Sequence, residues 1–205
     1  MMKMKPKMIA LALCAVVVAA GCQTISDTLL NMQRLQFKLD NVNNFQLAGV
    51  NLSNKTSVSD FSISDAVNLT RAFSNKNLPA QFIINVAAKN PNDGTNNSRQ
   101  TNATLTGLDW RLFIDGKETV AGGLASAVAV PGNGQSTTVP LSVSLNLYEF
   151  FANEGYDRLL NLALALGGAN GSASRITLDA QPTVSTQFGN LKYPGRIKIV
   201  DKEFH

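Results

Sequence analysis

Hydrophobic and polar residues alternate along most of the chain after residue 34. Alternation with a period of two predicts strands that bury one face and expose the other. The strand-like segments are 35–40, 45–50, 81–89, 104–114, 118–121, 127–130, 138–147, 175–179, 183–188, 191–193 and 196–200. Short strands at regular spacing, with turn residues between them, predict a mainly β protein built as an antiparallel β-sandwich.

Turn-forming residues separate these segments. Asp115 and Gly116 lie between two strand-like runs, and this dipeptide favours a two-residue hairpin because both central positions of a type I′ turn need positive φ. Residues 41–44 and 189–190 predict two further turns. The polar residues 93–103 predict a long exposed loop.

A short helix is predicted near residues 64–74. Ser64 is the expected N-cap, because its hydroxyl can accept a hydrogen bond from the first helical turn. Ala66, Leu69 and Phe73 share one helical face, and we expect this face to be buried.

A longer helical insertion is predicted near residues 148–166, where Gly155 can divide it into two pieces. Phe151, Tyr156 and Leu159 belong to its apolar face. Packing against the sandwich core is the simplest role for this face. Contact with a membrane, or enclosure of an apolar ligand against the sheet, are the alternatives.

The N-terminus has the pattern of an export signal. Lysines at positions 3, 5 and 7 precede 13 apolar residues, too few to span a bilayer, and Gly21 and Cys22 follow. This arrangement resembles the lipobox of bacterial lipoproteins. The resemblance implies a signal peptide at 1–21, acylation of Cys22, a tether at 22–34 and a sandwich domain at 35–205. Gln23, which is not Asp, implies sorting to the outer membrane, facing the periplasm.

Composition restricts the chemistry. The chain has 18 Lys and Arg against 14 Asp and Glu, and removal of the signal peptide leaves 15 against 14, which gives little attraction for nucleic acid. Cys14 lies in the signal peptide, so Cys22 is the one cysteine expected in the mature protein and no disulfide is predicted. The single histidine is His205. We therefore expect no metal site, no cofactor and no Ser-His-Asp or Cys-His catalysis.

Paired carboxylates are the remaining route to an enzyme. The candidates for such a pair are Asp109, Asp115, Glu149, Glu154 and Asp157. Asp115 is required by the predicted turn, and Glu154 is placed to pair with Arg158 four residues later. We therefore expect no glycosidase-type site and no enzymatic activity.

The sequence Asn90-Pro91-Asn92 could form a recognition loop or a metal-binding loop. Its spacing does not match an EF-hand, because no Glu stands where the twelfth position would fall. Asparagine side chains commonly bond to nearby backbone in turns, and this structural role is the preferred interpretation.

These motifs occur in an order that resembles the late embryogenesis abundant type 2 family, also described as the water-stress and hypersensitive-response (WHy) domain. The matching residues are Asn90, Pro91, Asn92, Gly107, Asp109, Trp110, Gly116 and Gly122. The resemblance covers residues 35–147 in outline and 81–143 in detail. It implies a fibronectin-III-like or immunoglobulin-like sandwich, a link to desiccation tolerance and no catalysis.

Three functions remain open. The first is a non-catalytic, lipid-anchored envelope protein that protects or binds other components under water stress. The second is a carrier of a lipid or other apolar ligand held between helix and sandwich. The third is a docking subunit of an envelope complex. Expected partners are the membrane, through acylated Cys22, and an envelope protein or lipid.

Overall fold

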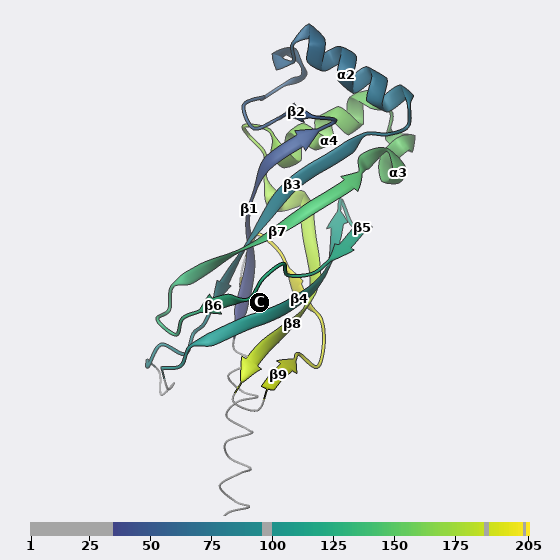
Figure 1. Ribbon diagram of the computed structural model, residues 1–205. Coiled ribbons are helices and arrows are strands. Elements are labelled where there is room, and N and C mark those ends of the chain that lie inside the picture. Colours follow the sequence, from purple (N-terminus) through teal and green to yellow (C-terminus); the bar gives the residue numbers. More distant parts are fainter. Residues whose placement is uncertain (1–34, 96–99, 187–188, 203) are drawn as a thin grey trace, which may run out of the picture.

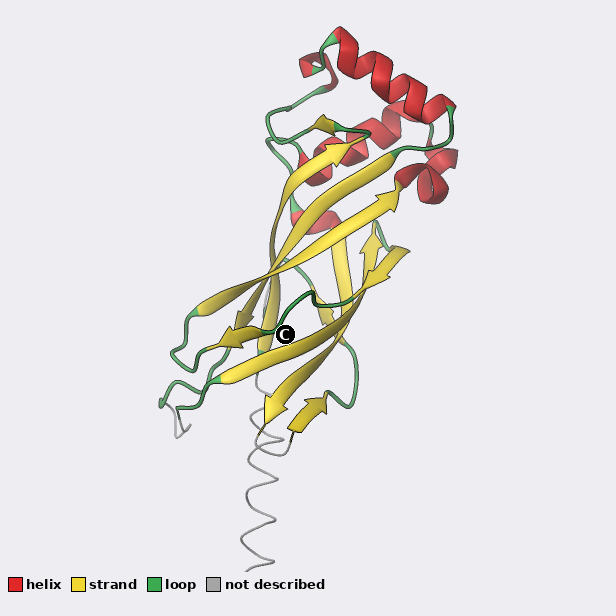
Figure 2. Ribbon diagram, viewed as in Figure 1, coloured by secondary structure: helices red, strands yellow, loops and turns green. Residues whose placement is uncertain are grey.

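Two antiparallel β-sheets face each other, and the helices gather at one end of the pair (Figures 1 and 2). The computed structural model describes residues 35–95, 100–186, 189–202 and 204–205. The predicted signal peptide and tether, with Cys22, lie outside the described residues. The predicted mainly β sandwich with small helices is confirmed.

The first sheet has the strand order β2-β1-β3-β7. Its strands are β1 (Gln36–Leu47), β2 (Val50–Asn51), β3 (Pro79–Lys89) and β7 (Ser136–Asn146). Alternate residues of β3, including Ile84 and Val86, are fully buried, as the period of two predicts. This sheet therefore presents one apolar face to the core.

The second sheet has the order β10-β8-β4-β5, with β6 beside β4 and β9 beside β8. Its strands are β4 (Ala103–Ile114), β5 (Lys117–Gly122), β6 (Val128–Val130), β8 (Ile176–Thr186), β9 (Gly189–Lys192) and β10 (Ile197–Ile199). Leu108 and Leu112 of β4 point into the core and are almost completely buried.

The C-terminal segment connects the two sheets. After β10 of the second sheet, the carbonyl of Val200 accepts a hydrogen bond from Leu39 N of β1 at 2.9 Å. Phe37 and His205 exchange two backbone hydrogen bonds, of 2.8 and 3.0 Å. The tail thus covers part of the β1 edge, which would otherwise expose unpaired backbone groups.

The predicted turn at 41–44 is wrong. β1 runs through these residues, with register shifts between Leu39 and Asn41 and between Asn43 and Gln46. Such irregularities let a strand absorb extra residues without reversing its direction. The chain reverses instead at Ala48 and Gly49, both with positive φ (47° and 80°), so the predicted strand 45–50 is divided between β1 and β2.

The C-terminal half needs a similar correction. The sequence pattern predicts separate strands at 175–179 and 183–188, but β8 is continuous from Ile176 to Thr186 because it pairs with β4 along its length. The predicted turn at 189–190 is also wrong. Gly189 and Asn190 pair with Thr186 and Ser185 within a ladder, while 187–188 lie outside the described residues.

The helical insertion is divided at Gly155, as the sequence allowed. Its parts are α3 (Leu147–Phe151), the 3₁₀ turn η2 (Ala152–Glu154) and α4 (Tyr156–Gly167). Gly155 has φ 79°, a value that favours glycine. The remaining helical elements are the 3₁₀ turns η1 (Val58–Asp60) and η3 (Ala173–Arg175), and α2 (Ile63–Ser74).

Helix α2 begins two residues earlier than predicted, with Ser62 rather than Ser64 as its N-cap. Ser62 Oγ accepts a hydrogen bond from Asp65 N at 3.1 Å, and Asp65 Oδ2 accepts one from Ser62 N at 3.0 Å. Hydrogen bonds from Lys55 and Ser62 lower the pKa of Asp65 below its usual value. Ser62 is preferred because Asp65 stands three residues later, whereas Ser64 is followed at that spacing by Val67.

The predicted buried face of α2 is partly wrong. Leu69 is buried and Phe73 packs against the core, but Ala66 is exposed. Ala72 takes its place against the core, while Ile63 remains 86% exposed. The buried face is set by how α2 lies over the end of the sandwich, and not by the residue at which the helix begins (Figure 1).

The matched variants Ser62→Ala and Ser64→Ala test this helix start. Ser62→Ala should lower the free energy of unfolding by about 1 kcal/mol, because it removes the acceptor of a first-turn N–H. Ser64→Ala should change it by less than about 0.5 kcal/mol. Equilibrium unfolding in urea measures both, and equal losses would contradict the assignment of Ser62.

Candidate functional site

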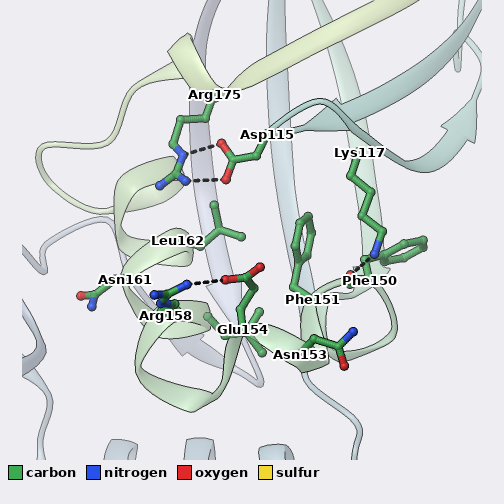
Figure 3. Close-up of a pocket in the computed structure, with 11 residues that line it drawn as sticks. Asp115, Lys117, Phe150, Phe151, Asn153, Glu154, Arg158, Asn161, Leu162 and Arg175 are labelled. Carbon is green, nitrogen blue, oxygen red and sulfur yellow. Dashed lines mark hydrogen bonds and ion pairs between the residues drawn. The ribbon is translucent and has the colours of Figure 1, made fainter.

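A surface pocket of about 490 Å³ lies between the helical insertion and the turn that joins β4 to β5 (Figure 3). We name it the cap pocket. Its lining combines charged and apolar side chains from three separate parts of the chain: Asp115, Lys117, Phe150, Phe151, Asn153, Glu154, Arg158, Leu159, Asn161, Leu162 and Arg175. Its volume lies within the usual range for sites that bind small molecules, roughly 300–1,000 Å³.

The β4–β5 turn places two of the charged groups. Asp115 and Gly116 have φ values of 50° and 78°, and Ile114 pairs with Lys117, which confirms the predicted two-residue hairpin. Asp115 Oδ1 accepts a hydrogen bond from Arg175 Nε at 2.6 Å, and a second bond joins Oδ2 to Arg175 Nη2. The bond with Asp115 raises the pKa of Arg175.

The helical insertion supplies the second ion pair. Arg158 Nη1 donates to Glu154 Oε2 at 3.0 Å, which confirms the pair expected from their spacing. Both side chains are at least half exposed, so the pair contributes little to stability. Its effect on the pocket is to neutralise the carboxylate of Glu154.

Lys117 differs from the two arginines. Its Nζ donates to the carbonyl of Phe150 and lies 5.5 Å from the centroid of the Phe151 ring. Among the described residues, none of the ion pairs includes Lys117. The pocket therefore carries three cations and two carboxylates, and Lys117 holds the positive charge that no carboxylate balances.

Apolar side chains form the inner wall. Phe151, Leu159 and Leu162 are 8%, 0% and 6% exposed, and Phe150 is half-buried. Two of the three residues predicted for an apolar ligand or membrane face, Phe151 and Leu159, thus line the pocket. Tyr156 does not line it and packs edge-on against Phe73, with ring centroids 5.3 Å apart.

Most of the apolar face of α4 belongs to the core. Ala163 and Leu166 are almost completely buried. A Cβ added to Gly167 would lie 2.1 Å from Phe45 Cβ, so the end of the helix lies directly against β1. Packing on the core is therefore the observed role of this face, and only its N-terminal part faces the cap pocket.

The Asn90-Pro91-Asn92 motif lies at the opposite end of the sandwich and is tied into the backbone. Asn90 and Asn92 are 1% and 2% exposed. Asn90 Nδ2 donates to the carbonyls of Thr101 at 2.8 Å and Val130 at 3.3 Å. Asn90 Oδ1 accepts from the backbone and side chain of Asn92, at 3.1 and 2.9 Å. One buried amide thus connects β3, the following loop and the end of β6.

Close packing accounts for Gly107 and Gly122, two of the residues that carry the family resemblance. A Cβ on Gly122 would lie 2.2 Å from Trp110 Cζ2, so the indole ring covers this residue. At Gly107, beside a register shift in the ladder with β8, a Cβ would lie 3.3 Å from Thr183 Cβ. Asp109 forms an exposed ion pair with Lys192. Each of these motif residues has a structural partner.

The second sheet also carries charged side chains that the sequence did not connect. Asp179 lies between Arg111 and Arg196, with Arg196 Nε 3.0 Å from Asp179 Oδ1. Burial acts to raise the pKa of Asp179, but hydrogen bonds from Arg111 and Arg196 outweigh it and lower the pKa. Asp179 of β8 thus joins Arg111 of β4 to Arg196, which lies just before β10.

Two further properties concern the described part of the chain. It contains no helix long and apolar enough to cross a membrane. It also contains no group of three or more His, Cys, Asp or Glu placed to hold a metal ion.

No model of a protein family matches the chain, and no curated protein matches it. Solved structures with some likeness include a protein from Archaeoglobus fulgidus, with 15% identity, TM-score 0.32, and 58% of this chain and 82% of that chain covered. A candidate late embryogenesis abundant protein has 11% identity and a TM-score of 0.36, with 93% of this chain and 84% of that chain covered. A protein from Arabidopsis thaliana has 12% identity and a TM-score of 0.34, with 82% of this chain and 83% of that chain covered. At these TM-scores the likenesses carry no argument about function.

Removal of the buried amide of Asn90 tests the role of the motif. Asn90→Ala should lower the free energy of unfolding by about 3 kcal/mol, because it leaves several buried backbone groups without partners. Asn85→Ala is the control: Asn85 Nδ2 makes one exposed hydrogen bond to Asn41, so the loss should stay below about 0.5 kcal/mol. Urea unfolding followed by the fluorescence of Trp110, the single tryptophan, measures both. Equal stability of Asn90→Ala and the parent would show that the network is dispensable.

Proposed function

We propose that the protein is a non-catalytic, lipid-anchored envelope protein whose sandwich, of late embryogenesis abundant type 2 character, protects or binds envelope components under water stress. The proposed location is the outer membrane, facing the periplasm. The observation that carries the proposal is the position of the cap pocket relative to the start of the sandwich. The cap pocket and the beginning of β1, where the chain enters the sandwich, lie at opposite ends of the sandwich.

The ladder between β1 and β3 defines these ends. Gln36 pairs with Lys89, next to the Asn90 network, and Leu47 pairs with Ala80, next to the helices. A strand of 12 residues spans about 40 Å. A chain held in a membrane through acylated Cys22 would enter at the Asn90 end and hold the cap pocket away from that point.

The proposed absence of catalysis is supported by the ion pairs of three of the five candidate carboxylates. Asp115 and Glu154 are each bound to an arginine at the pocket, and Asp109 is bound to Lys192. A general acid or base needs a carboxyl group poised to exchange a proton with a substrate. Carboxylates held in ion pairs are poorly suited to this role.

The family character is supported by the order of the motifs. Asn90 and Gly122 both occupy positions where their side chain, or lack of one, is required by packing. Residues with such requirements are expected in a shared sandwich framework. The proposed stress function follows from the resemblance and is open to direct test.

Metabolic labelling with an alkyne analogue of palmitate tests the anchor. The parent chain and Cys14→Ser should be labelled and sediment with membranes, because acylation uses the thiol of Cys22. Cys22→Ser should lose both properties. Labelling that persists in Cys22→Ser would contradict the anchor. Cys14→Ser is the matched control, because Cys14 is expected to be removed with the signal peptide.

Drying and rehydration of producing cells test the protective role. Cells that lack the protein should survive drying less well and take up more of a membrane-impermeant dye than cells with the parent chain. Cells with Cys22→Ser should resemble the deficient cells, because the protein is no longer held at the membrane. Equal survival of all three strains would reject the protective role and leave ligand binding as the second candidate, which the cap pocket itself favours.

A further inference from the structure

The lining of the cap pocket has the chemistry of a site for one class of small molecule. We propose that it binds an anionic amphiphile: an acyl chain that ends in a carboxylate or phosphate, with the anion at Lys117 and the chain against the apolar wall. This inference rests on the part of the proposed function in which the protein binds a ligand. It adds the chemical class of that ligand and the residue that selects its charge.

Charge balance selects an anion. Arg175 and Arg158 are already paired with Asp115 and Glu154. A cationic ligand would have to displace one of these arginines and would still meet the charge of Lys117. An anion leaves both pairs in place and compensates Lys117, the one cation of the pocket lining that forms no ion pair with a described carboxylate. The pocket is therefore complementary to a single negative headgroup.

Lys117 is placed to make this contact. Its ammonium group has three donor hydrogens, of which the carbonyl of Phe150 takes one. The side chain is exposed and reaches from the β4–β5 hairpin to the helical insertion, where its Nζ lies beside Phe150 (Figure 3). An incoming carboxylate or phosphate oxygen can accept one of the remaining hydrogens in a charge-assisted hydrogen bond, which is stronger than a neutral one.

The apolar wall accounts for the rest of the ligand. Phe150 contributes a half-buried ring next to the charged groups, Phe151 and Leu162 keep 8% and 6% of their surface exposed, and Leu159 is completely buried. An inorganic anion would leave the exposed part of this wall, mainly the Phe150 ring, in contact with water. An acyl chain would cover it and gain the free energy of apolar burial. The juxtaposition of cation and apolar wall thus indicates an amphiphile rather than a free ion.

Native mass spectrometry of the intact chain, released from a non-ionic detergent, tests the proposal with defined probes. We expect one dodecanoate per protein and similar binding of dodecyl phosphate. Dodecyltrimethylammonium, which has the same chain and the opposite charge, should bind much more weakly. Inorganic phosphate should not compete, because it cannot use the apolar wall; full competition by it would reject the amphiphile and indicate a free-anion site.

Two charge variants locate the anion. Lys117→Met, which keeps an unbranched side chain, should weaken dodecanoate binding about fivefold, the effect expected for loss of one exposed charge contact. Lys198→Met on β10, an exposed lysine outside the pocket, should leave it unchanged. No dodecanoate binding, or equal binding by Lys117→Met and the parent, would overturn the proposal.

A third variant separates the two halves of the ligand. Phe150→Ser should weaken dodecanoate and dodecyl phosphate alike, because both use the apolar wall. Unchanged binding in this variant would reject the assignment of the wall. All of these outcomes are independent of labelling at Cys22 and of survival after drying, so failure of the ligand assignment is distinguishable from failure of the proposed function.

Discussion

Burial of the alternating apolar side chains of two central strands, β3 and β4, determines the positions of all the other parts. Ile84 of β3 and Leu112 of β4 are completely buried, and complete burial of one such side chain contributes roughly 1.5–3 kcal/mol. The connection between β3 and β4 begins with Asn90, so the buried amide network lies at that end. β4 then runs the length of the sandwich and delivers Asp115 and Lys117 to the other end, where the helices lie.

The strands were largely predictable because alternation reports directly on burial. The errors occur where one local signal permits two outcomes. Asparagines at 41–44 suit a turn, but in the structure they lie in a strand whose register with β3 shifts around them. Ser62 and Ser64 are both suitable caps by residue type, and the position of Asp65 decides between them. In the first case the deciding contact is made by a neighbouring strand, and in the second Asp65, inside the predicted helix, bonds to Ser62, which lies before it.

The candidate site was less predictable than the fold. Periodicity identified Phe151 and Leu159, since an apolar helical face is visible in the sequence. It also included Tyr156, whose ring lies against Phe73 and not in the pocket, because periodicity assigns a face but not the neighbour that covers each part of it. Lys117 and Arg175 had no local signal at all. They are separated by 58 positions and line the same pocket because β4 and β8 pair, so that Ile114 stands opposite Ile176.

Because the cap pocket is built from distant segments, a ligand in it would contact separate parts of the chain. Lys117 belongs to the β4–β5 hairpin, whereas Phe150, Phe151 and Leu159 belong to the helical insertion. In the described structure, the hydrogen bond from Lys117 to the carbonyl of Phe150 joins these two parts directly. A ligand held by both would add a second connection, and any ligand that binds the folded state alone stabilises that state. The same geometry that makes the pocket invisible in the sequence therefore allows its occupant to tie the helical end to the second sheet.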